Sequence, residues 1–246
     1  MYTPQRLART AGLFYLLRTL MAIPVVYSRA KVHVPGDAAA TARNVVANAD
    51  LFRVGFVVEL AQATCMAFVA LILYALLKHV NRNAALALVI FGALSIAIVC
   101  VNSVFHLAAL HLATDASYQG AFGGQGPDAM VLLMLDLQSD GYLIAQIFFG
   151  LWLLPMGYLA YTSGMFPRAL GVGLVIACFG YLVETFTRFL APALGAALSP
   201  FVVAPAIIAE PAMVLWLLIK GVKTPPPDSP PPAAATVEPA SKGAES

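Results

Sequence analysis

The chain has 246 residues, of which 61% are hydrophobic and only 11% are charged. Soluble domains are about 45–50% apolar and about 25% charged, so this composition excludes an ordinary soluble protein and indicates a polytopic membrane protein. The formal net charge of +2 provides no strongly basic surface, and we expect no nucleic-acid partner.

Long apolar runs predict transmembrane helices, because a helix needs about 20 mostly apolar residues to cross a hydrocarbon core about 30 Å thick. Arg18 interrupts the first run and more runs follow, so we interpret that run as an uncleaved span rather than a signal peptide. The sequence therefore predicts an all-α bundle of six transmembrane helices within residues 1–223. The expected spans are residues 7–27, 51–77, 84–112, 141–161, 169–190 and 201–219.

The segments between these spans predict short helices on the outer side of the membrane. Asp37 is a suitable N-cap for a helix over residues 38–47, which is too short and too polar to span and is expected to lie at the interface. Residues 128–137 predict a second short interfacial helix, and Pro192 and Pro200 predict a loop. Residues 224–246 are rich in Pro and Ala and are expected to form a disordered cytoplasmic tail.

The distribution of Lys and Arg predicts the orientation of the chain. An even number of spans places both termini on one side, and the positive-inside rule identifies that side as the cytoplasm. We therefore expect a multi-pass protein of the cell (inner) membrane with both termini in the cytoplasm. The first outer loop fits this rule least well, because it also carries basic residues. The cations expected on the cytoplasmic side are Arg6, Arg9, Lys78, Arg82, Arg168, Lys220 and Lys223.

Several blocks of sequence give the chain a family resemblance. They are residues 34–42 (VPGDAAATA), 51–55 (LFRVG), 73–82, 141–150, 163–171 (SGMFPRALG), 180–182 and 215–221, which together extend over nearly all of residues 6–222. With these blocks the chain resembles the bacterial multi-span membrane proteins catalogued as domain-of-unknown-function family 4386. The resemblance implies a multi-pass membrane protein and carries no activity with it.

The candidate functional residues are ionisable groups inside the expected spans. Such groups are costly at membrane depth and therefore indicate a functional site by default. At 1.5 Å rise per residue, they fall at mid-depth or in the outer half of their spans. This distribution predicts a polar pocket that opens to the outside. The candidates are Arg18, Glu59, His106, Glu184, Arg188 and Glu210.

Three hypotheses of function are compatible with these residues. In the first, the protein binds or passes a small or amphipathic ligand, with the arginines holding an anionic group and the acids balancing charge. In the second, it is an intramembrane enzyme that uses a glutamate and His106 as acid and base. In the third, it is a structural or assembly partner, and Arg18 with Glu59 or Glu210, and Glu184 with Arg188, only lock helices together.

Nothing in the spacing of Cys, His and acidic residues indicates a metal or a cofactor. The three cysteines lie in apolar spans and are expected to be small core residues. His106 and His111 lie on different faces of their helix, so they do not form a metal-binding pair. We expect His106 to be a hydrogen-bonded core residue and His111 to be solvated at the interface.

Overall fold

The computed structural model describes residues 3–122 and 126–222, and these residues form helices and no strand. The elements are α1 (Pro4–Val32), α2 (Ala38–Ala47), α3 (Ala49–Leu77), α4 (Arg82–Thr114), α5 (Ala116–Phe122), α6 (Gly126–Thr162), α7 (Arg168–Leu190), α8 (Pro192–Val202), α9 (Ala204–Leu215) and a π-helical turn, η1 (Trp216–Lys220). The all-α prediction is confirmed. The expected disordered tail at 224–246 lies outside the described residues.

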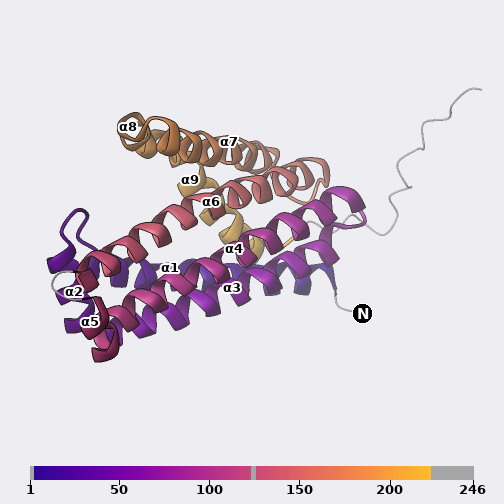
Figure 1. The fold of residues 1–246 in the computed structure, drawn as a ribbon. Coiled ribbons are helices and arrows are strands. Elements are labelled where there is room, and N and C mark those ends of the chain that lie inside the picture. Colours follow the sequence, from indigo (N-terminus) through magenta and orange to yellow (C-terminus); the bar gives the residue numbers. More distant parts are fainter. Residues whose placement is uncertain (1–2, 123–125, 223–246) are drawn as a thin grey trace, which may run out of the picture.

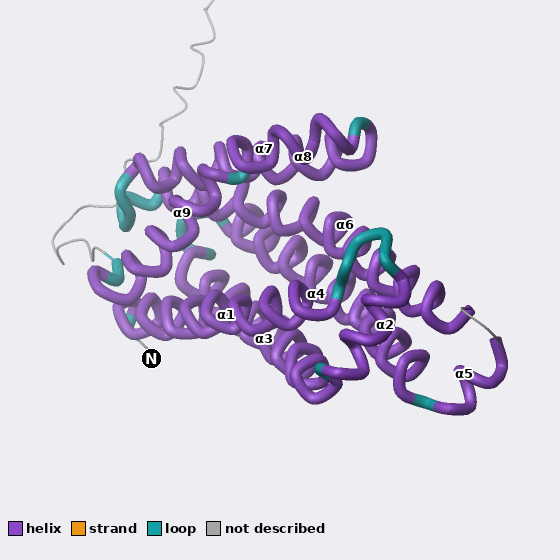
Figure 2. The backbone as a smooth tube through the Cα atoms, turned by 90° about the vertical axis from the view of Figure 1, so that its left-hand side faces the viewer, coloured by secondary structure: helices purple, strands orange, loops and turns teal. Residues whose placement is uncertain are grey.

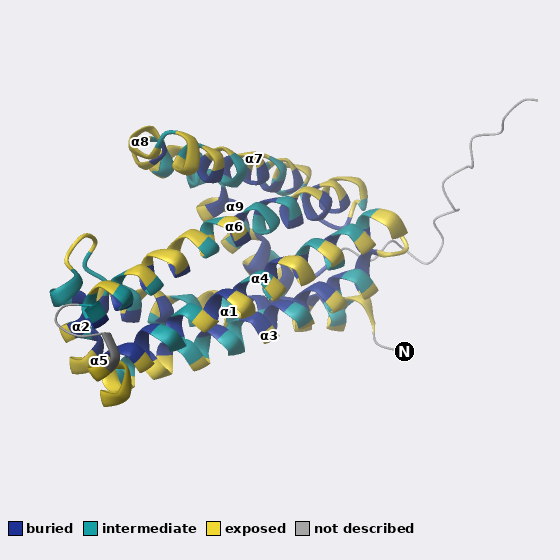
Figure 3. Cartoon of the chain, viewed as in Figure 1, coloured by how far each residue is buried: buried dark blue, intermediate teal, exposed yellow. Residues whose placement is uncertain are grey.

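Six helical segments within the described residues are long and apolar enough to cross a membrane, as predicted. Five are α1, α3, α4, α6 and α7, and the sixth is the run Pro192–Lys220, which combines α8, α9 and η1. Exposed residues lie along the outward faces of these helices (Figure 3). They include large apolar residues such as Val101, Phe201 and Ile208, which are suited to contact lipid.

The long helices α1, α3, α4 and α6 lie side by side and form the main part of the bundle (Figure 1). The most extensive pairings are α4 with α6, α1 with α3, and α6 with α7. Helices α8 and α9 pack on α7, and α9 with η1 returns the chain to α1. The short helices α2 and α5 both lie at the end of the bundle away from the N-terminus (Figure 2).

Two predicted boundaries are wrong. Residues 128–137 do not form a separate interfacial helix, because α6 runs without a break from Gly126 to Thr162. At Gly141 the helix passes close to α4, and the missing Cβ leaves the space that the Asn102 side chain occupies. The predicted loop around Pro192 and Pro200 is helix α8, in which Pro192 stands in the first turn where its missing N–H costs nothing.

Local hydrogen bonds fix the ends of several helices. The predicted cap is confirmed: Asp37 Oδ1 accepts a hydrogen bond from Ala40 N at 2.8 Å and begins α2. At the other end of the bundle, Gln5 Nε2 donates to Lys220 O at 2.9 Å and Gln5 Oε1 accepts from Val222 N at 3.0 Å. These bonds hold the beginning of α1 against the end of η1, so both ends of the described chain lie on the same side of the bundle.

Close contacts between helices depend on glycine. A Cβ on Gly157 would lie 2.7 Å from Gly171 O, so the backbones of α6 and α7 touch at this crossing. A Cβ on Gly180 would overlap the carbonyl oxygen of Val202, where α7 meets the end of α8. Gly173, also in α7, is different, because its Cβ would make an ordinary contact of 3.4 Å with Ala209 Cβ. Small residues at such crossings allow transmembrane helices to pack closely.

We therefore predict that Gly180→Ala destabilises the protein by about 1–3 kcal/mol, the usual cost of overpacking a tight contact. Gly173→Ala in the same helix is the matched control and should be neutral or slightly stabilising, because alanine favours helix by up to about 1 kcal/mol. Unfolding of the purified variants in detergent measures both effects. Equal stability of the two variants would contradict the close approach of Gly180 to Val202.

Candidate functional site

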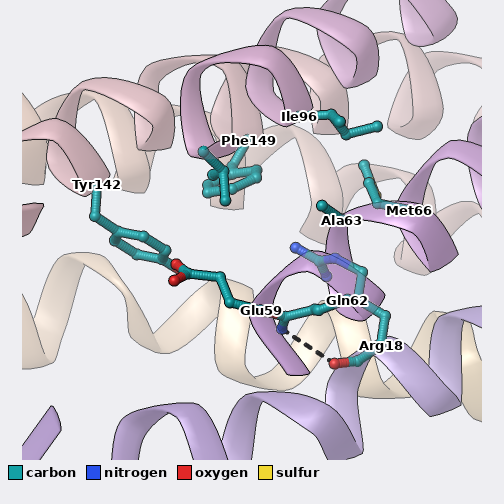
Figure 4. Close-up of a pocket in the computed structure, with 9 residues that line it drawn as sticks. Arg18, Glu59, Gln62, Ala63, Met66, Ile96, Tyr142 and Phe149 are labelled. Atoms are coloured by element: carbon teal, nitrogen blue, oxygen red, sulfur yellow. Dashed lines mark hydrogen bonds between the residues drawn. The ribbon is translucent and has the colours of Figure 1, made fainter. Parts of the chain in front are cut away.

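The first feature of the site is the Arg18 side chain, which projects from the middle of α1 into a small cavity between α1, α3, α4 and α6 (Figure 4). Its guanidinium carbon lies 5.8 Å from the Tyr15 ring centre and 5.7 Å from the Phe149 ring centre. Gln62 Nε2 donates a hydrogen bond to the backbone oxygen of Arg18 at 3.1 Å and not to its side chain. In the described part of the chain the guanidinium makes no ion pair and no hydrogen bond.

Glu59 lies on the same cavity but pairs with a different arginine. Arg29 Nη2, near the end of α1, lies 2.5 Å from Glu59 Oε1, and the Glu59 side chain is only 2% exposed. The second oxygen, Glu59 Oε2, is buried and has no partner among the described residues, and neither has Arg29 Nε. Arg29 also lies over the Tyr142 ring at 5.3 Å. The pair therefore neutralises Glu59 and leaves one carboxylate oxygen unsatisfied.

Glu210 accepts two tyrosine hydroxyls and is not bonded to Arg18. Tyr15 Oη donates to Glu210 Oε2 at 2.7 Å, and Tyr181 Oη donates to Glu210 Oε1 at 2.8 Å. Because the hydroxyl of Tyr15 contacts Glu210 while its ring faces Arg18, Tyr15 separates these two opposite charges. The arrangement joins α1, α7 and α9.

Glu184 forms a third, separate cluster. Its side chain accepts hydrogen bonds from Gln146 Nε2 at 2.6 Å and from Ser199 Oγ at 2.5 Å, so it connects α7 with α6 and α8. The expected pair with Arg188 is wrong. Arg188 is exposed near the end of α7, and none of the described residues forms an ion pair with it. A shared helix face made that pair possible, but closer polar groups on two other helices occupy Glu184.

His106 is a buried, hydrogen-bonded residue of the core, as expected. Its Nε2 lies 2.9 Å from Phe52 O, its Nδ1 lies 3.3 Å from Gln138 Nε2, and its ring stacks on Phe52 at 3.7 Å. Both ring nitrogens therefore have partners and neither partner is a carboxylate. This geometry does not provide the glutamate–histidine pair that the enzyme hypothesis requires.

The six candidates consequently do not share one pocket. Only Arg18 and Glu59 line the same cavity, and the others lie in separate clusters or at the surface. The cavity gives about 20 Å³ to the centre of a water-sized molecule, which is enough for one or two waters. Along one side it reaches Tyr142, whose side chain is 38% exposed.

Some residues of the site were missed from the sequence. Arg29 lies beyond the expected end of the first span at residue 27, whereas α1 continues to Val32. Gln62, Tyr142 and Phe149 also line the cavity, and they were missed because only residues with a charge or an imidazole were taken as candidates.

The expected pairs of Arg18 with Glu59 or Glu210 are also wrong. Arg29 is nearer to the Glu59 carboxylate, and the two tyrosine hydroxyls satisfy both oxygens of Glu210. Among the described residues, Arg18 is therefore a mid-span cation with two ring contacts and without an ion pair or a side-chain hydrogen bond of its guanidinium.

Comparison with known proteins places this fold in a family without assigning an activity. The chain is 31% identical over 155 residues to an uncharacterised protein of the archaeon Archaeoglobus fulgidus, a match that extends over 63% of this chain and 76% of that protein. No solved structure gives a significant match. The model of the family described as "Domain of unknown function (DUF4386)" matches residues 10–221, and the chain therefore belongs to that family.

Proposed function

We propose that this membrane protein binds a small or amphipathic ligand through an anionic group that contacts Arg18. The observation that carries the proposal is the Arg18 guanidinium, which lies at mid-span on a cavity without an ion pair or a hydrogen bond in the described residues. A charged side chain at the centre of a membrane costs about 2.5–3.5 kcal/mol on insertion scales and is usually compensated by a partner.

The chemistry of the cavity favours a carboxylate or a phosphate as that partner. The planar guanidinium presents N–H donors in a fixed fork that matches the two oxygens of such groups. Glu59 does not compete strongly for this position, because Arg29 already neutralises it at 2.5 Å. Tyr15 and Phe149 hold the guanidinium by their ring faces and leave its edge available for hydrogen bonds.

The size of the cavity limits which part of a ligand enters. Sites for whole drug-sized ligands have volumes of about 300–1,000 Å³, whereas only about 20 Å³ is available here to the centre of a water-sized molecule. The cavity therefore suits a headgroup and not a complete ligand. An amphipathic anion meets this limit, because its tail lies between helices or in the bilayer while its headgroup reaches Arg18 past Tyr142.

Oleate and oleyl alcohol are suitable probes, because they differ only in the anionic group. We predict that the purified protein binds oleate more tightly than oleyl alcohol, and that Arg18→Gln reduces oleate affinity at least tenfold, or about 1.4 kcal/mol. Arg18→Lys should retain part of the preference. Native mass spectrometry of the protein in detergent measures the bound ligand.

Arg188→Gln is the matched control, because it removes the same charge from an exposed position of α7. It should leave oleate binding unchanged. Equal binding of the two probes by the wild-type protein, or an equal loss in both glutamine variants, would contradict a specific role for Arg18. Thermal unfolding of each variant separates lost binding from lost folding.

The structural hypothesis is supported by one specific observation, the close pair of Arg29 and Glu59. Removing one partner of a buried pair costs about 3–5 kcal/mol, while replacing both by apolar residues is often neutral. We predict that Glu59→Leu or Arg29→Met alone lowers the free energy of unfolding, and that the double variant recovers most of it. If the double variant is as unstable as the single ones, the pair does more than lock α1 to α3.

We also propose that both termini lie in the cytoplasm. The connection between α6 and α7 contains Ser163, and the first outer loop contains Asp37, so these positions should lie on opposite sides of the membrane. A membrane-impermeant maleimide applied to whole cells is expected to label Asp37→Cys and not Ser163→Cys, in a chain whose native cysteines are replaced. Labelling of Ser163→Cys alone would reverse the orientation.

A further inference from the structure

A second set of side chains lies at the end of the bundle that carries α2 and α5, away from Arg18. His111 on α4 and Met130 and Met134 on α6 line one groove with a volume of about 440 Å³. Tyr118 of α5 lies on the same groove, and Val104 and Ala108 of α4 form its apolar wall. None of these residues takes part in the Arg18 cavity or in the hydrogen bonds of His106.

The register of α4 against α6 brings His111 and Met130 to similar heights, with Met134 one helical turn away. Asn102 Nδ2 donates to Gln138 O at 2.7 Å, which fixes these antiparallel helices at one level. From there, nine residues along α4 reach His111 and eight residues back along α6 reach Met130, so the two differ by only about 1.5 Å in height. Met134 is one helical turn from Met130 and lies on the same face.

The imidazole of His111 is available for a ligand. In the described residues it makes no hydrogen bond, and His111 is exposed at the groove. The nearby carboxylate of Asp115 is already engaged, because Asp115 Oδ1 accepts hydrogen bonds from Ser117 N at 2.9 Å and from Ser117 Oγ at 2.6 Å. Met130 and Met134 are partly buried, and their thioethers have three rotatable bonds each with which to adjust.

We propose that His111, Met130 and Met134 form a binding site for a soft monovalent metal ion of the Cu(I) type. Thioether sulfur selects Cu(I) among biological metals, and neutral imidazole completes such a site. Zinc sites use thiolates, imidazoles and carboxylates, and the groove contains no cysteine and only one histidine. Thioethers are uncharged, and a single positive charge costs less than a double one at the edge of an apolar bundle.

The sequence contains no zinc motif and no pair of histidines on one helix face that would indicate this site. Its ligands come from two helices, and methionine is common in transmembrane cores for packing alone. The spacing of Met130 and Met134 gains meaning only when α4 places His111 opposite them. The proposal is independent of the Arg18 site, because the two sets of residues do not overlap.

The test is a titration of the purified, chelator-treated full chain with Cu(I) under anaerobic conditions in competition with a chromophoric Cu(I) chelator. Ag(I) serves as the probe that cannot change its oxidation state. We expect one equivalent of metal to be retained against the chelator. The double variant Met130→Leu/Met134→Leu should lower the affinity at least tenfold, and so should His111→Leu.

The matched control is Met156→Leu/Met165→Leu, which removes two thioethers from the core cluster outside this groove. All four methionine substitutions conserve volume and are expected to fold, because such exchanges usually cost less than about 1.5 kcal/mol. All variants keep Cys65, Cys100 and Cys178, so metal bound by cysteine is the same in each and cancels in the comparison.

X-ray absorption of the copper-loaded protein provides a second readout, with both sulfur and nitrogen neighbours expected in the wild type. Loss of the nitrogen neighbour in His111→Leu supports the assignment. Equal retention of metal by the wild type, the groove variants and the control would overturn it. Absence of any retained equivalent in the wild type would overturn it as well.

Discussion

Compensation of charge inside the apolar bundle is the constraint on which the arrangement of this protein depends. Each carboxylate at membrane depth has different partners: Glu59 pairs with Arg29 through one oxygen, Glu210 accepts the hydroxyls of Tyr15 and Tyr181, and Glu184 accepts from Gln146 and Ser199. Every one of these contacts joins different helices. These polar contacts therefore tie neighbouring helices together, while the surrounding apolar residues provide most of the packing.

These contacts also explain how the irregular last span is held. One residue, Val203, separates α8 from α9, and α9 continues directly into the π-helical turn η1. Ser199 on α8 bonds to Glu184, Glu210 on α9 accepts two tyrosines, and the backbone of Lys220 in η1 accepts the Gln5 side chain. Each of the three pieces is thus connected to α1 or α7 by at least one side-chain hydrogen bond.

The sequence was sufficient to predict the number of spans, most of their limits and the cap at Asp37, because hydropathy and capping act locally. It was not sufficient to predict which side chains would contact each buried carboxylate. Glu184 and Arg188 share a helix face, yet Gln146 and Ser199 from other helices occupy the carboxylate and Arg188 is exposed. Similarly, α6 continues through Gly141 and packs there against Asn102 of α4, a contact that no property of residues 128–141 alone reveals.

Arg18 differs from the buried carboxylates because its guanidinium has no charged partner within hydrogen-bond distance among the described residues. A cation in a span is normally compensated by moving a side chain toward it, but here the nearby acids are already bound. Glu59 contacts Arg29, and both oxygens of Glu210 accept hydroxyls, one of them from the tyrosine that stands between Glu210 and Arg18. Moving Glu210 to Arg18 would break a hydrogen bond between helices, and Glu59 is held by Arg29 through Oε1. An anion from outside the chain would compensate Arg18 without that cost, which is the physical reason for assigning ligand binding to this residue rather than to the other candidates.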